Sequence, residues 1–287
     1  MSTLTSKASK RRSGSRIGIG DILLYILLIG LAVICFLPFY FMIINATHDN
    51  AHIAQGLNLL PGSSAWANYL KMSSRVNIWR GFLNSLIVSG AGTALLAYFG
   101  TLTSYGFSKY KFPGNKFLFW IILCSMMVPA QLSIIGYFDV VLKLKLLNNL
   151  LALIIPMIAN AQFVYFVKLY IDSTLPDSII ESARIDGCSE IGIFNKMVLP
   201  IAAPSIATMG MFNFISSWNQ LLIPQIVLRK PELHTIPIIV ATAKGVYRTD
   251  FSAAYMAIAI SVVPILIAFA LFSKQIIGGV TAGSVKG

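Results

Sequence analysis

The 287-residue sequence carries little charge: 11% of its residues are Asp, Glu, Lys or Arg, compared with about 25% in an ordinary soluble domain. Acidic residues are the scarcest, with 10 Asp and Glu against 22 Lys and Arg. Hydrophobic residues make up 56% of the chain, and the mean hydropathy is +0.77. This composition excludes a soluble globular domain. Because the apolar residues fall in long blocks, it also argues against a nucleic-acid partner as the reason for the basic charge.

Cysteines and nucleotide-binding motifs are also scarce. Cys35 and Cys124 lie in apolar blocks and Cys188 in a polar segment, so we expect neither a disulfide framework nor a metal site. The sequence contains no Gly-Lys-Ser or Gly-Lys-Thr of a phosphate-binding loop. We therefore expect no cofactor and no enzyme activity on this chain, and any ATP and Mg to be bound by a partner ATPase.

Six apolar runs are long enough to cross a membrane as helices, because a bilayer core of about 30 Å requires roughly 20 apolar residues. The runs cover 22–44, 82–106, 117–138, 147–167, 201–228 and 251–272. The second and fifth contain dispersed Ser, Thr, Gly and Asn, which predicts that they pack inside a bundle. The fold class predicted is all-α: a polytopic membrane protein with six transmembrane helices.

Basic residues predict the orientation of these spans. The first 20 residues contain five Lys and Arg and no acid, and such an excess beside the first span stays in the cytoplasm, near anionic lipid headgroups. The first run is too long for a signal peptide, and no small-residue cleavage site follows it. With six spans both termini are cytoplasmic, which divides the chain into a basic segment (1–20), a transmembrane domain (21–277) and a cytoplasmic tail (278–287).

None of the six runs contains Asp, Glu, Lys, Arg or His. Proton pumps, ion-coupled transporters and voltage sensors usually place ionisable groups inside the membrane. The runs therefore favour a path for a neutral solute, and they are equally compatible with a passive channel.

The longest predicted cytoplasmic loop, 172–200, has the pattern of a helix, a glycine turn and a second helix. Thr174 and Asp177 have the spacing of a capping box, and Gly187 suits the left-handed residue that ends a helix. We therefore predict a first helix over 176–186.

Ser189 is placed to cap the second helix, over 190–199, and Pro200 predicts a bend where the chain re-enters the membrane. One face of the first helix is apolar, and we expect it to point outward or downward and to fit a groove on another protein. That face comprises Ile179, Ile180 and Ala183. The alternative is an amphipathic connector that rests on headgroups.

The same loop resembles the EAA loop of importer-type ABC permeases. Residues 181–187 read Glu-Ser-Ala-Arg-Ile-Asp-Gly, and Phe194 and Leu199-Pro200 follow, while Ser182 and Met197 replace the Ala and Ile of the pattern. The carbohydrate branch, specifically the maltose-type permease subunit with six spans, is similar from about Gly20 onward. The matching segments are Asn84-Ser85, Lys111-Phe112-Pro113-Gly114, Met127-Val128-Pro129, Ser217-Trp218-Asn219 with Pro224, and the tail 279–287.

This resemblance implies one of two permease subunits of a binding-protein-dependent sugar importer in the bacterial inner membrane. The first helix of the loop is then a cytoplasmic coupling helix between spans 4 and 5, which docks on an ATPase dimer, and the tail reaches that dimer. The implied joint consists of Glu181, Ala183, Asp186, Gly187, Phe194, Leu199 and Pro200, with Glu181 facing a basic ATPase residue. The other implied partners are a second permease and a periplasmic or extracellular sugar-binding protein.

A sugar path needs hydrogen-bonding groups and aromatic faces inside the bundle. The candidates are Asn160, Gln162, Tyr165, Asn213, Ser216, Ser217, Trp218, Asn219 and Gln220. Such residues also bond neighbouring helices without touching substrate, and for each residue alone we favour that interpretation. Trp218 is equally suited to anchor a membrane interface, and the resemblance implies that the partner permease makes most sugar contacts.

The prediction is therefore a permease subunit that works by alternating access. The alternatives are an ABC permease for a non-sugar solute and a passive channel or structural membrane subunit, the last of which leaves 176–200 unexplained. The external loop 49–80, with Trp66, Tyr69 and Trp79, is predicted either to lie on the membrane or to meet the binding protein.

Overall fold

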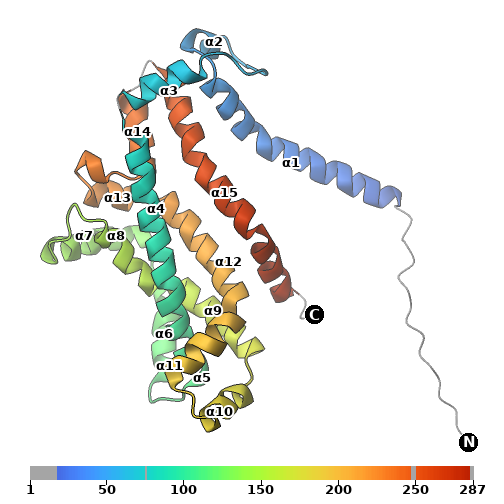
Figure 1. Cartoon of the computed structure of the whole chain (residues 1–287), viewed down its shortest axis with the longest axis vertical. Coiled ribbons are helices and arrows are strands. Elements are labelled where there is room, and N and C mark those ends of the chain that lie inside the picture. Colours follow the sequence, from blue (N-terminus) through green and yellow to red (C-terminus); the bar gives the residue numbers. More distant parts are fainter. Residues whose placement is uncertain (1–17, 75, 247–249, 285–287) are drawn as a thin grey trace, which may run out of the picture.

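The computed structural model describes residues 18–74, 76–246 and 250–284. All regular structure in these ranges is helical (Figure 1), which confirms the all-α prediction. Four helical stretches are long and apolar enough to cross a membrane: Ile19–Ala46, Ile78–Lys109, Leu151–Thr174 and Glu190–Trp218. Two shorter apolar helices accompany them, Asn115–Ser125 and Phe251–Ile267.

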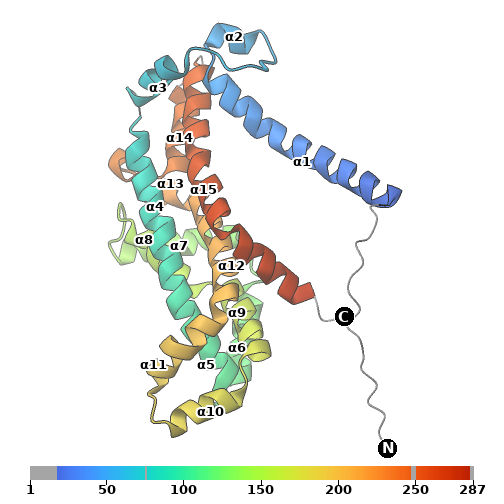
Figure 2. The ribbon, with the colours of Figure 1, turned by 45° about the vertical axis from the view of Figure 1, so that its right-hand side comes forward.

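The first long helix, α1 (Ile19–Ala46), diverges from the bundle and packs beside α15 (Phe251–Ser284) near its C-terminal end (Figures 1 and 2). None of its most apolar 18-residue window is buried, whereas a third of the corresponding window is buried in each of the other three. A helix that is apolar all round needs an apolar surrounding. The rest of this chain does not supply that surrounding to α1.

The second long stretch is a continuous helix made of α4 (Ile78–Leu95), the π-helical turn η1 (Leu96–Gly100) and α5 (Thr101–Lys109). Its 32 residues span about 48 Å at 1.5 Å per residue, so it extends beyond a bilayer core. Its buried face includes Asn84, Ser85 and Ser89. One face of the predicted second run thus packs against the bundle, whereas Leu83, Leu86 and Ile87 are exposed.

The third predicted span, 117–138, is not one helix. α6 (Asn115–Ser125) ends in a turn that leads to Pro129, and the short 3-10 helix η2 (Ala130–Ser133) and α7 (Ile134–Lys143) follow. Pro129 has no N–H to continue a helix and disfavours helical geometry in the residue before it. The continuous helix predicted here was therefore wrong.

The fourth span is also interrupted. α8 (Leu151–Ile154) passes into the 3-10 helix η3 (Ile155–Ala159), and α9 (Ala161–Thr174) begins anew after Asn160. The Asn160 side chain accepts a hydrogen bond from the Phe163 N–H at 2.9 Å, which caps the new helix. In place of the single helix predicted over 147–167, the structure has a helical stretch that begins at Leu151, breaks at Asn160 and ends at Thr174.

In the fifth span, α11 (Glu190–Ile193), the π-helical turn η4 (Phe194–Val198) and α12 (Leu199–Trp218) form one continuous helix. The second helix of the loop, which was predicted to end at 199, therefore continues through Pro200 into the fifth span. Pro200 is the second residue after the π turn, where the regular hydrogen-bond ladder is already altered, so a residue without an N–H is tolerated there. The helix ends at Trp218 and not at 228, because the separate helix α13 (Leu222–Val227) follows.

The remaining elements gather at the two ends of the bundle (Figure 2). At one end, here called the α3 end, lie α2 (Asn50–Ala54), α3 (Ala65–Ser73) and α14 (Ile236–Val246), with the 3-10 helix η5 (Pro231–Leu233). At the opposite, α10 end lie α10 (Asp177–Ile185) and α11. Helix α15 continues to Ser284, so no helix end marks the predicted boundary at 277/278. Most of the predicted 1–20 segment and the last residues of the tail lie outside the described ranges.

Candidate functional site

The segment 172–200 folds into the predicted helix, turn and helix. Gly187 has φ +78°, the left-handed conformation that ends α10, and the Ser189 hydroxyl accepts the Gly192 N–H at 3.2 Å, which caps α11. The capping box predicted from Thr174 and Asp177 is absent: the Thr174 hydroxyl instead donates to the carbonyl of Tyr170 at 2.7 Å.

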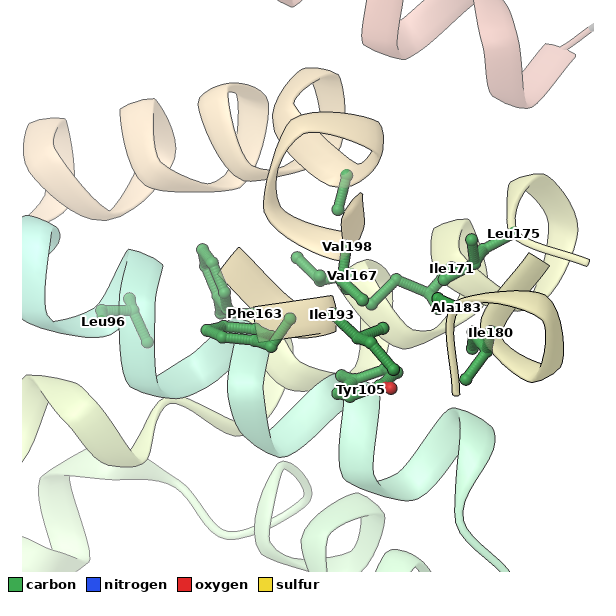
Figure 3. Packing of buried hydrophobic residues seen from close by; sticks show 12 residues of the cluster. Leu96, Tyr105, Phe163, Val167, Ile171, Leu175, Ile180, Ala183, Ile193 and Val198 are labelled. Atoms are coloured by element: carbon green, nitrogen blue, oxygen red, sulfur yellow. The ribbon is translucent and has the colours of Figure 1, made fainter. Parts of the chain in front are cut away.

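The apolar face of α10 points toward the bundle. Ile180 and Ala183 are buried in a cluster with residues of α5, α9 and the helix that begins with α11 (Figure 3). The expectation that this face points outward was therefore wrong for Ile180 and Ala183, whereas Ile179 is 36% exposed. The outward side carries Glu181 and Ile185, and the Ile185 side chain is 87% exposed.

The start of α10 is bound to the end of α5 by Lys109. The Lys109 ammonium donates to the carbonyl of Leu175 at 2.6 Å and to the carboxylate of Asp177 at 2.7 Å. The Lys109 side chain is only 8% exposed, whereas that of Asp177 is 76% exposed. The hydrogen bond from Lys109 lowers the pKa of Asp177, so this carboxyl group is ionised at neutral pH.

The end of α10 is bound to α5 through a second group. Arg184 Nε donates to Glu190 Oε1 at 2.7 Å, and Arg184 Nη2 donates to Glu190 Oε2 at 3.3 Å. The Tyr110 hydroxyl, one residue beyond α5, also donates to Glu190 Oε2. The Arg184 guanidinium lies 5.5 Å from the centre of the Tyr110 ring, within the range of a cation–π contact.

The predicted joint residues divide into exposed and buried groups. Glu181, Asp186 and Gly187 are exposed together on α10 and its turn, whereas Ala183 and Phe194 are buried. On the next helix, Leu199 is half-buried and Pro200 is exposed. Sequence reasoning missed Lys109 and Tyr110, because their partners lie 66 to 80 residues away along the chain.

Among the predicted path residues, three join helices to one another. Asn213 Nδ2 of α12 donates to Thr93 Oγ1 of α4 at 3.0 Å, and Asn160 Nδ2 donates to Asn213 Oδ1 at 3.3 Å. The Ser89 hydroxyl of α4 donates to the Ser217 hydroxyl at 3.1 Å. These neutral groups satisfy one another between α4, α9 and α12, as polar side chains in a membrane bundle must.

The other path candidates differ in exposure. Trp218 is 2% exposed and its Nε1 donates to the Ser261 carbonyl at 3.4 Å, so it is a core residue here and not an interface anchor. Tyr165 is half-buried and stacks on Phe119. Four polar side chains on α9, α12 and the turn that follows are exposed: Gln162, Ser216, Asn219 and Gln220.

Comparison with known proteins identifies the family of this chain. The family model described as "Binding-protein-dependent transport system inner membrane component" matches residues 97–277. The arabinooligosaccharides transport system permease protein AraQ of Halalkalibacterium halodurans is 32% identical over 273 residues, which are 93% of this chain and 98% of that protein. The diacetylchitobiose uptake system permease protein NgcG of Streptomyces coelicolor is 29% identical, over 91% of this chain and 87% of that protein.

Two further similarities extend the comparison. The sn-glycerol-3-phosphate transport system permease protein UgpE of Escherichia coli is 28% identical, over 88% of this chain and 92% of that protein. A chain in the crystal structure of a bacterial ABC transporter involved in the import of the acidic polysaccharide alginate has a TM-score of 0.77 and 24% identity. The match covers 93% of this chain and 99% of that one, and it shows a shared fold.

The described part of the chain consists of apolar helices joined by neutral polar contacts, with a helical hairpin at one end, which is the architecture of a membrane protein. The chain belongs to the family of binding-protein-dependent transport system inner membrane components. It is a membrane protein, a permease subunit of an ABC importer, and not an enzyme. Importers of this kind also contain a substrate-binding protein and an ATPase.

Proposed function

We propose that this chain is one of two permease subunits of a carbohydrate importer and that α10 is its coupling helix. The observation that carries the proposal is the outward face of α10. Glu181 and the 87%-exposed Ile185 lie at the tip of the bundle, while Ile180 and Ala183 fix the opposite face to the core. An exposed apolar side chain beside an acid suits a partner groove that contains a basic residue.

The proposed topology has six crossings with both termini in the cytoplasm. The four long helical stretches supply four crossings, and the segments around Asn115–Ser125 and Phe251–Ile267 supply the other two. The α10 end then faces the cytoplasm and the α3 end faces outward. The basic residues of segment 1–20 support this orientation.

The proposed substrate is a sugar or oligosaccharide. Two of the relatives named above are permeases for oligosaccharides by their names, and the spans offer neutral hydrogen-bonding groups without ionised ones. We place the substrate path along the exposed polar residues of α9 and α12, with Gln162 and Asn219 as its main candidates. Asn160, Asn213 and Ser217 hold the path in shape, and Tyr165 and Trp218 support it by packing.

The proposed partners follow from the exposed surfaces. The apolar surface of α1 meets lipid and the second permease. At the α3 end Trp66 and Trp79 are 68% and 55% exposed, and this surface receives the sugar-binding protein. ATP and Mg bind to the ATPase dimer, whose closure moves α10 and drives alternating access.

The first test is to tag the chain, purify it in mild detergent from its host and identify its companions by mass spectrometry. We expect a second permease and an ATP-hydrolysing subunit. In Gly187→Leu the ATPase should be lost, because a left-handed residue with a side chain is strained by about 1–2 kcal/mol and the turn after α10 shifts. Recovery of the chain alone would contradict the proposal and favour a passive channel.

The matched control is Gly114→Leu. Gly114 has φ +82°, close to the +78° of Gly187, and no atom lies within 4 Å of a Cβ built at either residue. Both variants carry the same backbone strain at the same end of the bundle, but only Gly187 adjoins α10. Equal loss of the ATPase in both variants would contradict the proposal that α10 is the coupling helix.

The substrate is tested by uptake into cells or proteoliposomes that contain the whole transporter. The labelled solutes are arabinotriose, diacetylchitobiose, glycerol 3-phosphate and a dipeptide. We expect ATP-dependent uptake of a sugar and about a fivefold or greater loss in Gln162→Leu or Asn219→Leu. Uptake of only the dipeptide, or uptake without ATP, would contradict the carbohydrate proposal.

A further inference from the structure

The helix Ile78–Lys109 ends beside α10, but α6, α7, α8 and α9 separate the two along the chain. The chain joins α10 directly to α9 at one end and, through Gly187, to the continuous helix Glu190–Trp218 at the other. A displacement of α10 therefore reaches α9 and α12 through the backbone. It reaches α4 and α5 only through side-chain contacts.

Two residues at the end of that helix make polar contacts with both ends of α10. Lys109 joins the start of α10 through the carbonyl of Leu175 and the carboxylate of Asp177. Because the Lys109 side chain is 8% exposed, its ammonium is held in place and is poorly solvated. Its two acceptors, one of them a backbone carbonyl, fix the end of α5 to the start of α10.

Tyr110 joins the other end of α10. Its hydroxyl donates to Glu190, which also accepts from Arg184 of α10. The backbone of Tyr110 is fixed in turn, because Asn115 Nδ2 donates to its carbonyl at 2.8 Å. Because Glu190 holds the hydroxyl of Tyr110 and Asn115 holds its backbone, Tyr110 is suited to transmit a displacement of α10.

We infer that Lys109 and Tyr110, here called the α5 anchor, are positioning residues that transmit movement of α10 to the helix Ile78–Lys109. The inference rests on the proposed function, since it requires that an ATPase moves α10. The α5 anchor couples that movement to α4, whose Thr93 and Ser89 bond to α12 in the middle of the bundle. Through these contacts, closure at the α10 end would change the interior at the level of the substrate path.

The experiment compares coupling in the purified whole transporter. The test variant is Lys109→Gln with Tyr110→Phe, which removes the charge and the hydroxyl but keeps most of the volume. The control is Lys116→Gln with Tyr170→Phe, which makes the same chemical changes at an exposed lysine and in α9. Uptake of the sugar transported by the wild type and ATP hydrolysis are measured per assembled complex.

We expect uptake by the test variant to fall about fivefold or more while ATP hydrolysis continues, because the α5 anchor carries coupling and not assembly. The control should retain both activities. Uptake and hydrolysis that fall together, in proportion to a loss of assembled complex, would reduce the α5 anchor to a folding contact and overturn the inference.

A second measurement follows the movement itself. Spin labels are placed on exposed positions of the two elements, at Leu83 of α4 and Ser178 of α10, and their separation is measured with and without a non-hydrolysable ATP analogue. The three native cysteines, Cys35, Cys124 and Cys188, are exposed and are replaced by serine beforehand.

The distance distribution should respond to nucleotide differently in the two backgrounds. In the control, α4 follows α10, so the separation stays nearly constant; in the test variant, α10 moves alone and the separation changes. The same response in both would overturn the inference while leaving the proposed function intact. Failure to recover any ATPase with the wild-type chain would overturn the proposed function itself.

Discussion

The middle of the bundle and its α10 end both contain polar contacts between distant segments, but they use different chemistry. In the middle, Asn213 bonds to Thr93 and Asn160 without any charge. At the α10 end, Lys109 and Arg184 pair with carboxylates around an apolar cluster. Neutral groups satisfy one another's hydrogen bonds where water is scarce. Charged groups are tolerated where water solvates their outer side.

The comparison separates two tasks of polar side chains in this chain. The interior contacts hold three helices together, since no hydrophobic effect drives helices together inside a lipid bilayer. At the α10 end the apolar cluster supplies the cohesion, and the ion pairs set the orientation of α10. The following changes test that division, beginning with the largest expected effect.

Gly100→Val should be the most damaging change. A Cβ at Gly100 would lie 2.7 Å from Cδ1 of Phe163 and 2.9 Å from Cδ1 of Leu96, and overpacking of this kind costs about 1–3 kcal/mol. Thermal unfolding in detergent measures the effect. Gly90→Val is the control, because a Cβ at Gly90 has no atom within 4 Å. If the ion pairs, and not the apolar cluster, held the α10 end together, Gly100→Val would lower the stability no more than removal of those ion pairs does.

Asn213→Leu should rank second. The substitution leaves Thr93 and Asn160 without their shared partner, and loss of such contacts in a membrane bundle costs about 1–2 kcal/mol. Asn219→Leu is the control, because Asn219 is exposed and bonds only to the carbonyl of Ile215 in its own helix. Equal destabilisation by both changes would remove the distinction between interior and surface contacts.

Salt should distinguish the two regions by a smaller effect. The stability difference between the wild type and Asp177→Asn should shrink from about 0.05 M to about 1 M NaCl, because the screening length falls to about 3 Å. The difference caused by Asn213→Leu should not change with salt. A salt-independent Asp177→Asn difference would mean that Lys109 is shielded from solvent on every side.

Acid should produce the smallest effect. The hydrogen bond from Lys109 holds the pKa of Asp177 below its ordinary value of 3.8, so this carboxylate stabilises the fold above that ordinary value. The contribution is lost as the pH falls through the lower, folded-state pKa. Unfolding curves of the wild type and Asp177→Asn should therefore differ at pH 6 and converge below about pH 4. A constant difference down to about pH 3 would contradict this assignment.

Local signals made the α10 segment predictable in part. Gly187 and Ser189 act on their own backbone or on that of near neighbours, so their roles follow from sequence alone. The direction of the apolar face could not be predicted from sequence, because Ile180 and Ala183 can be buried against a partner or against their own bundle. Only the packing of α10 on α9 and on the helix that contains Phe194 decides between these.

Four of the six predicted spans coincide with long apolar helices, but the interruptions in the third and fourth predicted spans were not foreseen. Apolar composition marks a segment as buried in lipid, and it does so equally for a straight helix and for one that breaks at Asn160 or before Pro129. The α5 anchor was not predictable either, since Lys109 and Tyr110 resemble ordinary flanking residues. Their partners are distant along the chain, and pairing of that kind depends on the three-dimensional arrangement.

The two π-helical turns have a consequence for how sequences of this kind diverge. η1 and η4 meet at one side chain: Phe194 packs in the cluster with Leu96, and its ring lies 5.4 Å from that of Tyr98. A π turn closes its hydrogen bond over one more residue than an α turn does, so each marks a tolerated single-residue insertion. In alignments with relatives we therefore expect a one-residue gap at η1 to occur together with a one-residue gap at η4. Loss of one π turn alone would rotate its helix about its axis and displace the contacts of the Phe194 ring.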